Sequence, residues 1–111
     1  MSDSATLIRQ IKIKSGSTKR LFKEHKSYVV EEEQQKIKLD KFIANGAEEW
    51  DIKNARKMLE ESGKMIQDST KRLGTAVQDL RQLLVSAEKN PDIAKNEEVL
   101  KAEEVLEEVS V

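Results

Sequence analysis

A run of uncharged residues at heptad spacing, between residues 52 and 87, constrains the fold of this 111-residue chain more than any other feature. Alternating steps of three and four from Ile52 meet no charged residue, although 37% of the chain is Asp, Glu, Lys or Arg. The seam consists of Ile52, Ala55, Leu59, Ser62, Ile66, Ser69, Leu73, Ala76, Leu80, Leu83 and Ala87. Such a seam is typical of a long helix packed along another helix. Met58, Met65, Val77 and Leu84 flank it and indicate a second neighbour, as in a helical bundle.

Start and stop signals divide the chain into three helices, which we expect over residues 4–44, 51–88 and 91–108. The connections between them are short, and short connections place successive helices antiparallel. The predicted fold class is therefore all-α. We expect an up-down-up antiparallel three-helix bundle with two long helices and a shorter third, forming a single domain over residues 1–111.

The helix boundaries rest on particular capping residues. Residues 2–4 supply N-cap oxygens for the first helix, and the Asn45-Gly46 pair stops it. For the second helix we expect Asp51 as the N-cap, with Trp50 packed against the following turn as a hydrophobic staple with Ala55. For the third we expect Asn90 as the N-cap, followed by proline in the first helical position.

Charge is unevenly distributed along the chain. Residues 1–30 carry seven Lys/Arg and two Asp/Glu, whereas residues 90–111 carry two Lys/Arg and seven Asp/Glu. On a helical wheel, one face of the first helix forms a basic arc of Arg9, Lys12, Lys19, Arg20, Lys23 and Lys26, with Ile13 beside it. The basic and acidic segments could attract each other within the bundle, or either could face a partner.

The residue types needed for most chemistry are missing or scattered. The chain has one His and no Cys, and it contains no glycine-rich phosphate loop or nucleophile motif, so we expect no metal, no cofactor and no enzyme activity. We expect His25 to be a hydrogen-bonded core or boundary residue rather than a ligand or a pH switch, and Met58 and Met65 to be core filler. No apolar run is long enough for a signal peptide or a membrane span, so we expect a cytoplasmic protein without a membrane partner.

Two stretches carry motifs that occur together in one known family. The first is Arg9-Gln10-Ile11-Lys12-Ile13-Lys14-Ser15-Gly16, followed by Lys19-Arg20-Leu21, Lys23-Glu24 and Tyr28. The second is Trp50-Asp51-Ile52-Lys53, followed by Leu59-Glu60-Glu61-Ser62, Met65-Ile66, Asp68 and Lys71-Arg72-Leu73. In this order and spacing they resemble the tubulin-folding cofactor A (tubulin-specific chaperone A) family, over about residues 9–84.

The resemblance implies a small cytoplasmic, cytoskeleton-associated chaperone with a three-helix bundle. Such a protein captures quasi-native β-tubulin after its release from the chaperonin and hands it on toward αβ-tubulin heterodimer assembly, without nucleotide or metal. Other tubulin-folding cofactors are further candidate partners, and we favour a monomer over a dimer. Matched positions give candidate β-tubulin contacts at Lys12, Ile13, Lys19, Arg20, Lys23, Glu24, Tyr28, Lys53, Glu60, Glu61, Met65, Asp68 and Arg72. Because tubulin is acidic, the basic arc has a physical reason to face it.

The sequence departs from the family pattern at two positions. Trp50 stands where the family usually has Tyr, a change that keeps an aromatic residue before Asp51. Gln67 stands where the family often has Pro, and proline inside a helix would kink it. Without this proline, we expect the bend of the second helix either to come from Gly63 or to be weaker.

Two other classes of function compete with this interpretation. A self-associating coiled-coil adaptor would share the seam of the second helix between chains, and sedimentation as a 12.7 kDa monomer would argue against it. A nucleic-acid binder would use the basic arc. The acidic pI near 5.9 and the lack of aromatic residues among the basic ones argue against that class, so we expect no nucleic acid partner.

Overall fold

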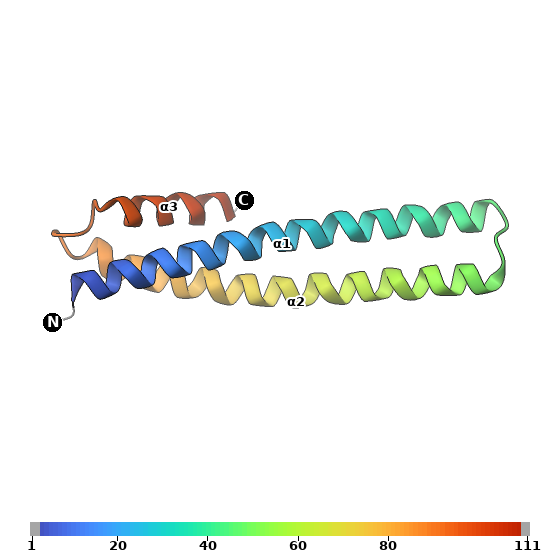
Figure 1. The fold of residues 1–111 in the computed structure, drawn as a ribbon, viewed down its shortest axis with the longest axis horizontal. Coiled ribbons are helices and arrows are strands. Elements are labelled where there is room, and N and C mark those ends of the chain that lie inside the picture. Colours follow the sequence, from blue (N-terminus) through green and yellow to red (C-terminus); the bar gives the residue numbers. More distant parts are fainter. Residues whose placement is uncertain (1–2, 110–111) are drawn as a thin grey trace. The chain divides into compact units, whose positions relative to one another are not determined.

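The structure, a computed structural model, describes residues 3–109, and in this range every regular element is a helix (Figure 1). Helix α1 spans Ser4–Ala44, α2 spans Glu49–Glu88 and α3 spans Glu97–Val109. Hydrogen bonds join the start of α1 to the connection just after α2 and the middle of α1 to the middle of α2, so these two helices are antiparallel. The predicted all-α helical bundle is confirmed.

The described part of the chain divides into two compact units. Residues 3–22 and 72–109 form one, which we call the three-helix unit because it contains α3 with parts of α1 and α2. Residues 23–71 form the other, the two-helix unit, built from the remaining parts of α1 and α2. The single domain expected over residues 1–111 stays a prediction.

Both ends of α1 follow the predicted capping. The Asp3 carboxylate accepts a hydrogen bond from the Thr6 amide at 3.3 Å, as an N-cap side chain does, while Ser2 lies outside the described residues. At the other end Gly46 has φ of 67°, and the Ala47 amide donates to the Phe42 carbonyl at 2.9 Å. This is the Schellman geometry, in which glycine takes the left-handed conformation and satisfies carbonyls at the helix end.

The expected start of α2 is wrong by two residues. The Glu48 carbonyl accepts a hydrogen bond from the Ile52 amide at 3.1 Å, so the helix begins at Glu49 and Asp51 lies within its first turn. Trp50 is consequently a helical residue with 71% of its surface exposed, and the expected staple does not form. Two acidic side chains in the first turn complement the helix dipole and favour the earlier start. At its other end α2 continues without interruption through Gln67 to Glu88.

The expected start of α3 near residue 91 is also wrong. Asn90 does cap a turn, accepting the Asp92 amide at 3.0 Å on its side chain and the Ala94 amide at 2.9 Å on its carbonyl. That turn ends at once, and Asn96 becomes the N-cap of the continuous helix by accepting the Glu98 amide at 2.8 Å. The side-chain amide of Asn90 also donates a hydrogen bond to the Ser4 hydroxyl at 3.3 Å, which links this connection to the start of α1.

The predicted seam of α2 is confirmed, since every one of its positions is buried or half-buried. In the three-helix unit it joins a hydrophobic cluster to which all three helices contribute. The buried members of this cluster are Ile11, Leu80, Leu84, Ala87, Ile93, Val99, Ala102 and Val105. Leu80 and Val99 are fully buried and anchor α2 and α3 in this core.

The residues that flank the seam do not form one line. Leu84 is buried in the cluster with α3, whereas Met58 and Met65 are 38% and 41% exposed. The methionines stand one residue before a seam position in the two-helix unit, whereas Val77 and Leu84 stand one residue after a seam position in the unit that contains α3. The two pairs therefore lie on opposite sides of the seam, and the second neighbour indicated by the sequence is found at Leu84.

The interface in the two-helix unit combines the buried Leu39 of α1 with small and polar residues. Along α2 its buried positions are Ala55, Ser62 and Ser69. Opposite them, α1 presents larger polar side chains, and a Cβ on Gly63 would stand 3.5 Å from the Glu32 carboxylate. Small residues on one helix thus leave room for long polar ones on the other.

Gly74 offers a direct test of helix stability. A Cβ built there meets nothing within 4 Å, and glycine is about 1 kcal/mol less favourable than alanine inside a helix. Gly74→Ala should therefore raise the free energy of unfolding by about 0.5–1 kcal/mol in urea denaturation. Gly46→Ala is the opposite control: its positive φ should make it destabilising by about 1–2 kcal/mol. A less stable Gly74→Ala variant would contradict the open surroundings seen at this glycine.

Candidate partner-binding surfaces

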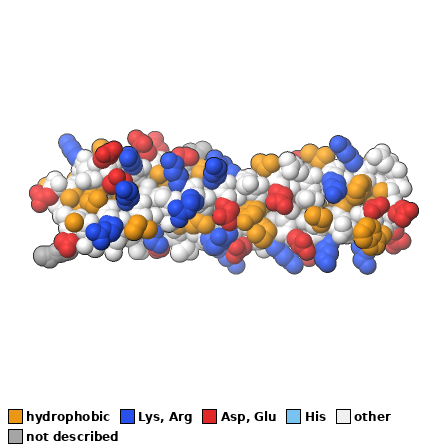
Figure 2. Space-filling model, in the orientation of Figure 1, with side chains coloured by type: hydrophobic (Ala, Val, Ile, Leu, Met, Phe, Trp, Pro, Cys, Tyr) orange, Lys and Arg blue, Asp and Glu red, His pale blue; other side chains and the backbone are white. Residues whose placement is uncertain are grey.

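The residues predicted to contact a partner are distributed over both units. In the three-helix unit these are Lys12, Ile13, Lys19, Arg20 and Arg72. In the two-helix unit they are Lys23, Glu24, Tyr28, Lys53, Glu60, Glu61, Met65 and Asp68. All are exposed except Glu24 and Tyr28, which are half-buried. The face drawn in Figure 2 shows how charged and hydrophobic side chains mix at the surface.

Part of the basic arc of α1 lies beside the acidic helix α3. Lys12 and Lys19 border a groove of about 430 Å³, and its α3 side carries three carboxylates and one lysine: Glu98, Glu104, Glu108 and Lys101. Attraction between the basic and acidic segments of the chain is therefore present inside the three-helix unit. The basic side chains remain exposed, so the same charges are also accessible from solution.

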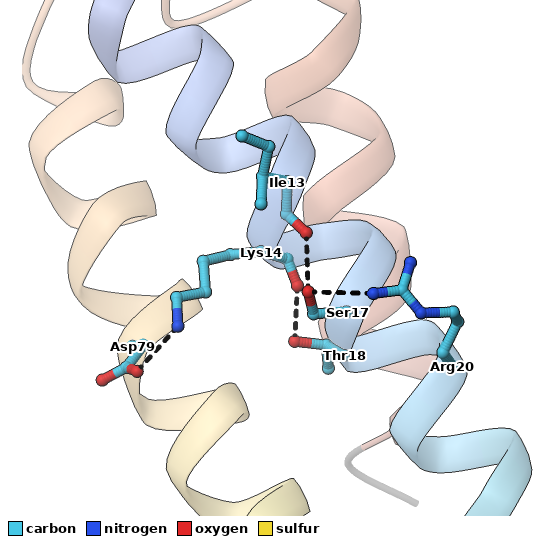
Figure 3. Close-up of polar contacts among 6 residues, drawn as sticks. All are labelled: Ile13, Lys14, Ser17, Thr18, Arg20 and Asp79. Atoms are coloured by element: carbon cyan, nitrogen blue, oxygen red, sulfur yellow. Dashed lines mark hydrogen bonds and ion pairs between the residues drawn. The ribbon is translucent and has the colours of Figure 1, made fainter.

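Ile13 is the exposed apolar side chain beside this arc, with 60% of its surface accessible. It borders a groove of about 460 Å³ between α1 and α2, together with Leu83 and several polar residues. Lys14, the next residue, reaches across to α2 and pairs with Asp79 at 3.2 Å (Figure 3). Both partners are about two-fifths exposed, so the ion pair fixes the position of the Lys14 side chain more than it adds stability.

Local hydrogen bonds along α1 hold the polar side chains around Ile13. The Thr18 hydroxyl is fully buried and donates to the Lys14 carbonyl at 2.8 Å. The Ser17 hydroxyl donates to the Ile13 carbonyl at 3.1 Å and accepts from the Arg20 guanidinium at 3.4 Å (Figure 3). Arg20, a predicted contact residue, is thus partly oriented by its own helix.

Glu24 and Tyr28, two further predicted contacts, bond to each other. The Tyr28 hydroxyl donates to the Glu24 carboxylate at 3.0 Å across one turn of α1. Nearby, His25 lies 2.8 Å from the Ser69 hydroxyl through its Nδ1 atom. Ser69 also donates to the Ile66 carbonyl at 3.0 Å, a pattern in which Nδ1 carries the hydrogen. The prediction of a hydrogen-bonded His25 is confirmed.

Two grooves in the two-helix unit carry most of the predicted residues of α2. The first, of about 370 Å³, includes Met65 and Glu61 together with Met58, which the prediction did not include. The second, of about 500 Å³, includes Lys53 and Glu60 beside the exposed Trp50. The expectation that the two methionines are core filler is wrong, because the interface at this point is filled by smaller residues. Spacing alone could not have placed Met58 on the surface with Met65, because Val77 and Leu84 have the same spacing of seven outside the seam and Leu84 is buried.

One pair of carboxyl groups links α2 to α3. A hydrogen bond with the Glu88 side chain raises the pKa of Glu103 above its usual value of 4.5, and desolvation and repulsion from Glu88 add to the shift. On α3 itself, Glu97 lies 3.2 Å from Lys101, and it raises the pKa of that exposed lysine through hydrogen bonding and charge.

The Glu103 shift predicts a pH-dependent stability. A raised folded-state pKa favours the protonated carboxyl, so its contribution is present below the unfolded-state pKa and is lost as pH rises through the folded-state pKa. Glu103→Gln keeps a neutral hydrogen-bonding group at every pH. We therefore expect the variant to melt above wild type at pH 7, with a difference that disappears by about pH 4. A difference independent of pH would show that the two carboxyl groups do not interact.

Two further searches bear on the possible chemistry. Within residues 3–109, no three His, Asp or Glu side chains are grouped closely enough to hold a metal ion. In the same range no helix combines the length and apolar character required to cross a membrane.

Comparison with known proteins gives a consistent picture. The family model described as tubulin binding cofactor A matches residues 6–106. Tubulin-specific chaperone A of Rattus norvegicus is 47% identical over 79 residues, which cover 71% of this chain and 73% of that protein. Tubulin-folding cofactor A of Arabidopsis thaliana is 38% identical over 85 residues, covering 77% of this chain and 75% of that protein.

Solved structures extend the similarity to the fold. The crystal structure of tubulin folding cofactor A from Arabidopsis thaliana aligns with a TM-score of 0.88 at 33% identity, covering 96% of this chain and 97% of that one. The structure of human tubulin chaperone cofactor A aligns with a TM-score of 0.80 at 40% identity, covering 95% and 99% respectively. Sequence and structure therefore point to the same relatives.

Proposed function

Because the chain belongs to the tubulin binding cofactor A family, we propose that it captures quasi-native β-tubulin after release from the chaperonin and passes it on toward αβ-tubulin heterodimer assembly. The observation that carries this proposal is the family match over residues 6–106. The role we propose is one of binding in the cytoplasm, without catalysis or a cofactor. Other tubulin-folding cofactors are then the proteins to which β-tubulin would be passed.

Exposed side chains on α1 and α2 support binding of β-tubulin along the helices. Exposed basic side chains on α1, including Lys19, Arg20 and Lys23, offer charge complementarity to an acidic partner. Exposed apolar side chains, Ile13 on α1 and Met65 on α2, offer the contact area that such charges do not. We propose the full set of predicted contact residues as the candidate β-tubulin surface.

The packing of α2 favours this function over a coiled-coil adaptor. Seam residues such as Leu80 and Ala87 are buried against α1 and α3 of the same chain. A seam already filled in this way needs no second chain. We therefore propose a monomer as the active form.

A mixing experiment tests the proposal. β-Tubulin released from chaperonin is combined with the folded chain and separated by size exclusion, and fractions are probed for both proteins. Co-elution, followed by transfer of β-tubulin into heterodimers when α-tubulin and the other cofactors are added, is the expected result. Separate elution of the two folded proteins would refute the proposed capture.

A further inference from the structure

The groove beside Met58 and Met65 in the two-helix unit combines flexible apolar walls with polar groups. The two methionines stand seven residues apart on α2, about 10 Å along its axis, and are 38% and 41% exposed. The α1 wall is formed by Glu31 and Gln35, and Glu61 adds a carboxylate from α2. An apolar side chain of a partner fits between thioether groups, which adapt to irregular shapes.

Gln35 supplies a second, independent observation. Its side-chain oxygen, Oε1, is buried and has no hydrogen-bond partner among residues 3–109. Buried side-chain oxygens normally accept a hydrogen bond, and leaving one unpaired is costly. Because Gln35 lines the groove, rotation of its side-chain amide presents this oxygen to an N–H group on a bound partner, which then supplies the missing donor.

The charges around the groove specify which kind of donor fits. Glu31 and Glu61 place carboxylates on the α1 and α2 walls. The basic residue at the groove, Lys64, lies 3.7 Å from the Glu60 carboxylate on its own helix. A cationic or amide donor on the partner is therefore favoured near Gln35, whereas a carboxylate is disfavoured.

From these features we propose that the groove binds a segment of the captured tubulin that carries a large apolar side chain next to a lysine or arginine. This inference rests on the proposed function and specifies one of its contacts. The apolar side chain lies between Met58 and Met65, and the basic group donates toward Gln35 and the carboxylates. Methionine walls suit a partner that is still completing its fold, because they repack around different shapes at little cost.

The first test removes the apolar walls. Met58→Gln/Met65→Gln should keep the helical content and melting temperature of wild type, since both side chains are already substantially exposed, yet weaken β-tubulin binding about tenfold or more. Val30→Gln/Ile43→Gln is the matched control, because these side chains are 57% and 48% exposed in the same unit but do not line the groove. The control should bind as wild type does.

The second test addresses the unpaired oxygen. Gln35→Leu removes the buried acceptor while keeping a similar volume, so the melting temperature should stay the same or rise. Binding should nevertheless weaken about tenfold, because the donor on the partner loses its acceptor. A purely structural role for Gln35 would change stability and leave binding unaltered.

The outcomes separate the two proposals. If wild type binds β-tubulin and the methionine and Gln35 variants bind equally well, the groove is not a contact and the capture function stands. Equal weakening by the Val30→Gln/Ile43→Gln control would likewise overturn the groove as a specific site. If folded wild type does not bind β-tubulin, the proposed function fails and the groove proposal fails with it.

Discussion

Replacing Leu80 with alanine is expected to lower the free energy of unfolding by about 2–5 kcal/mol, the largest stability loss of any single substitution considered for this chain. Leu80 has no exposed surface and lies in the cluster that joins α2 to α1 and α3. Truncation removes apolar contacts and leaves a cavity that the packed helices can close only in part. Urea denaturation followed by circular dichroism measures the loss directly.

Val85→Ala serves as the control for this substitution. Val85 lies on the same helix with 50% of its surface exposed, so its truncation should change stability by no more than about 0.5 kcal/mol. Hydrogen exchange should also show that Leu80→Ala opens the three-helix unit, including α3. A melting temperature for Leu80→Ala within about 2 °C of wild type would mean that this cluster does not hold the fold.

Reversing three charges of the basic arc is expected to cause the largest loss of binding. Lys19→Glu/Arg20→Glu/Lys23→Glu places carboxylates on an exposed part of α1 that we propose faces an acidic partner. Like charges brought together at an interface cost several kcal/mol, so the affinity for β-tubulin should fall by about 100-fold or more. Titration by fluorescence anisotropy at two salt concentrations measures both the loss and its electrostatic origin.

The matched control reverses three other lysines of the same helix. Lys36→Glu/Lys38→Glu/Lys41→Glu makes the same change in net charge at exposed positions outside the candidate surface. Both triple variants should retain the helical content of wild type. Equal loss of affinity in both variants would show that net charge determines binding and that the location of the basic arc does not. Unaltered binding by the arc variant would exclude the basic arc from the β-tubulin contact surface.

Long periodic features were predictable because many residues act together. Every seam position of α2 is buried or half-buried, because heptad spacing sustained over this length leaves few alternative packings. Helix α1 spans the expected residues, because the glycine C-cap fixes where it ends. The opposite charges of α1 and α3 left two alternatives open, attraction within the bundle or contact with a partner, and the structure places the two segments side by side. The family resemblance, carried by two separate motifs, is confirmed by the match over residues 6–106.

Single capping residues predicted the starts of the helices less reliably, because several nearby residues can each serve as the N-cap. Asn90 with the following proline is a good helix start, and it does initiate a turn. Asn96, followed by two glutamates, is an equally good one, and the continuous helix begins there. The start of α2 also had two candidates, and the acidic first turn favours a start at Glu49 over one at Asp51.

The exposure of most candidate contact residues could be predicted from the sequence, but their grouping on the surface could not. Helical spacing identifies an exposed face, yet it does not tell which side of the seam receives the third helix. Leu84 is buried in the cluster with α3, whereas Met58 and Met65 lie in the two-helix unit, which contains no part of α3, and stay exposed. The position of α3 also places Lys12 and Lys19 beside its acidic residues, an arrangement that depends on where α3 starts.

The measurement that tests the account most directly is the native mass of the species formed when the 12.7 kDa chain meets chaperonin-released β-tubulin. We predict one chain and one β-tubulin in a single complex, with the unbound chain as a monomer. A chain that runs as a dimer and leaves β-tubulin free would contradict the account, and a self-associating adaptor would then become the better explanation of this bundle.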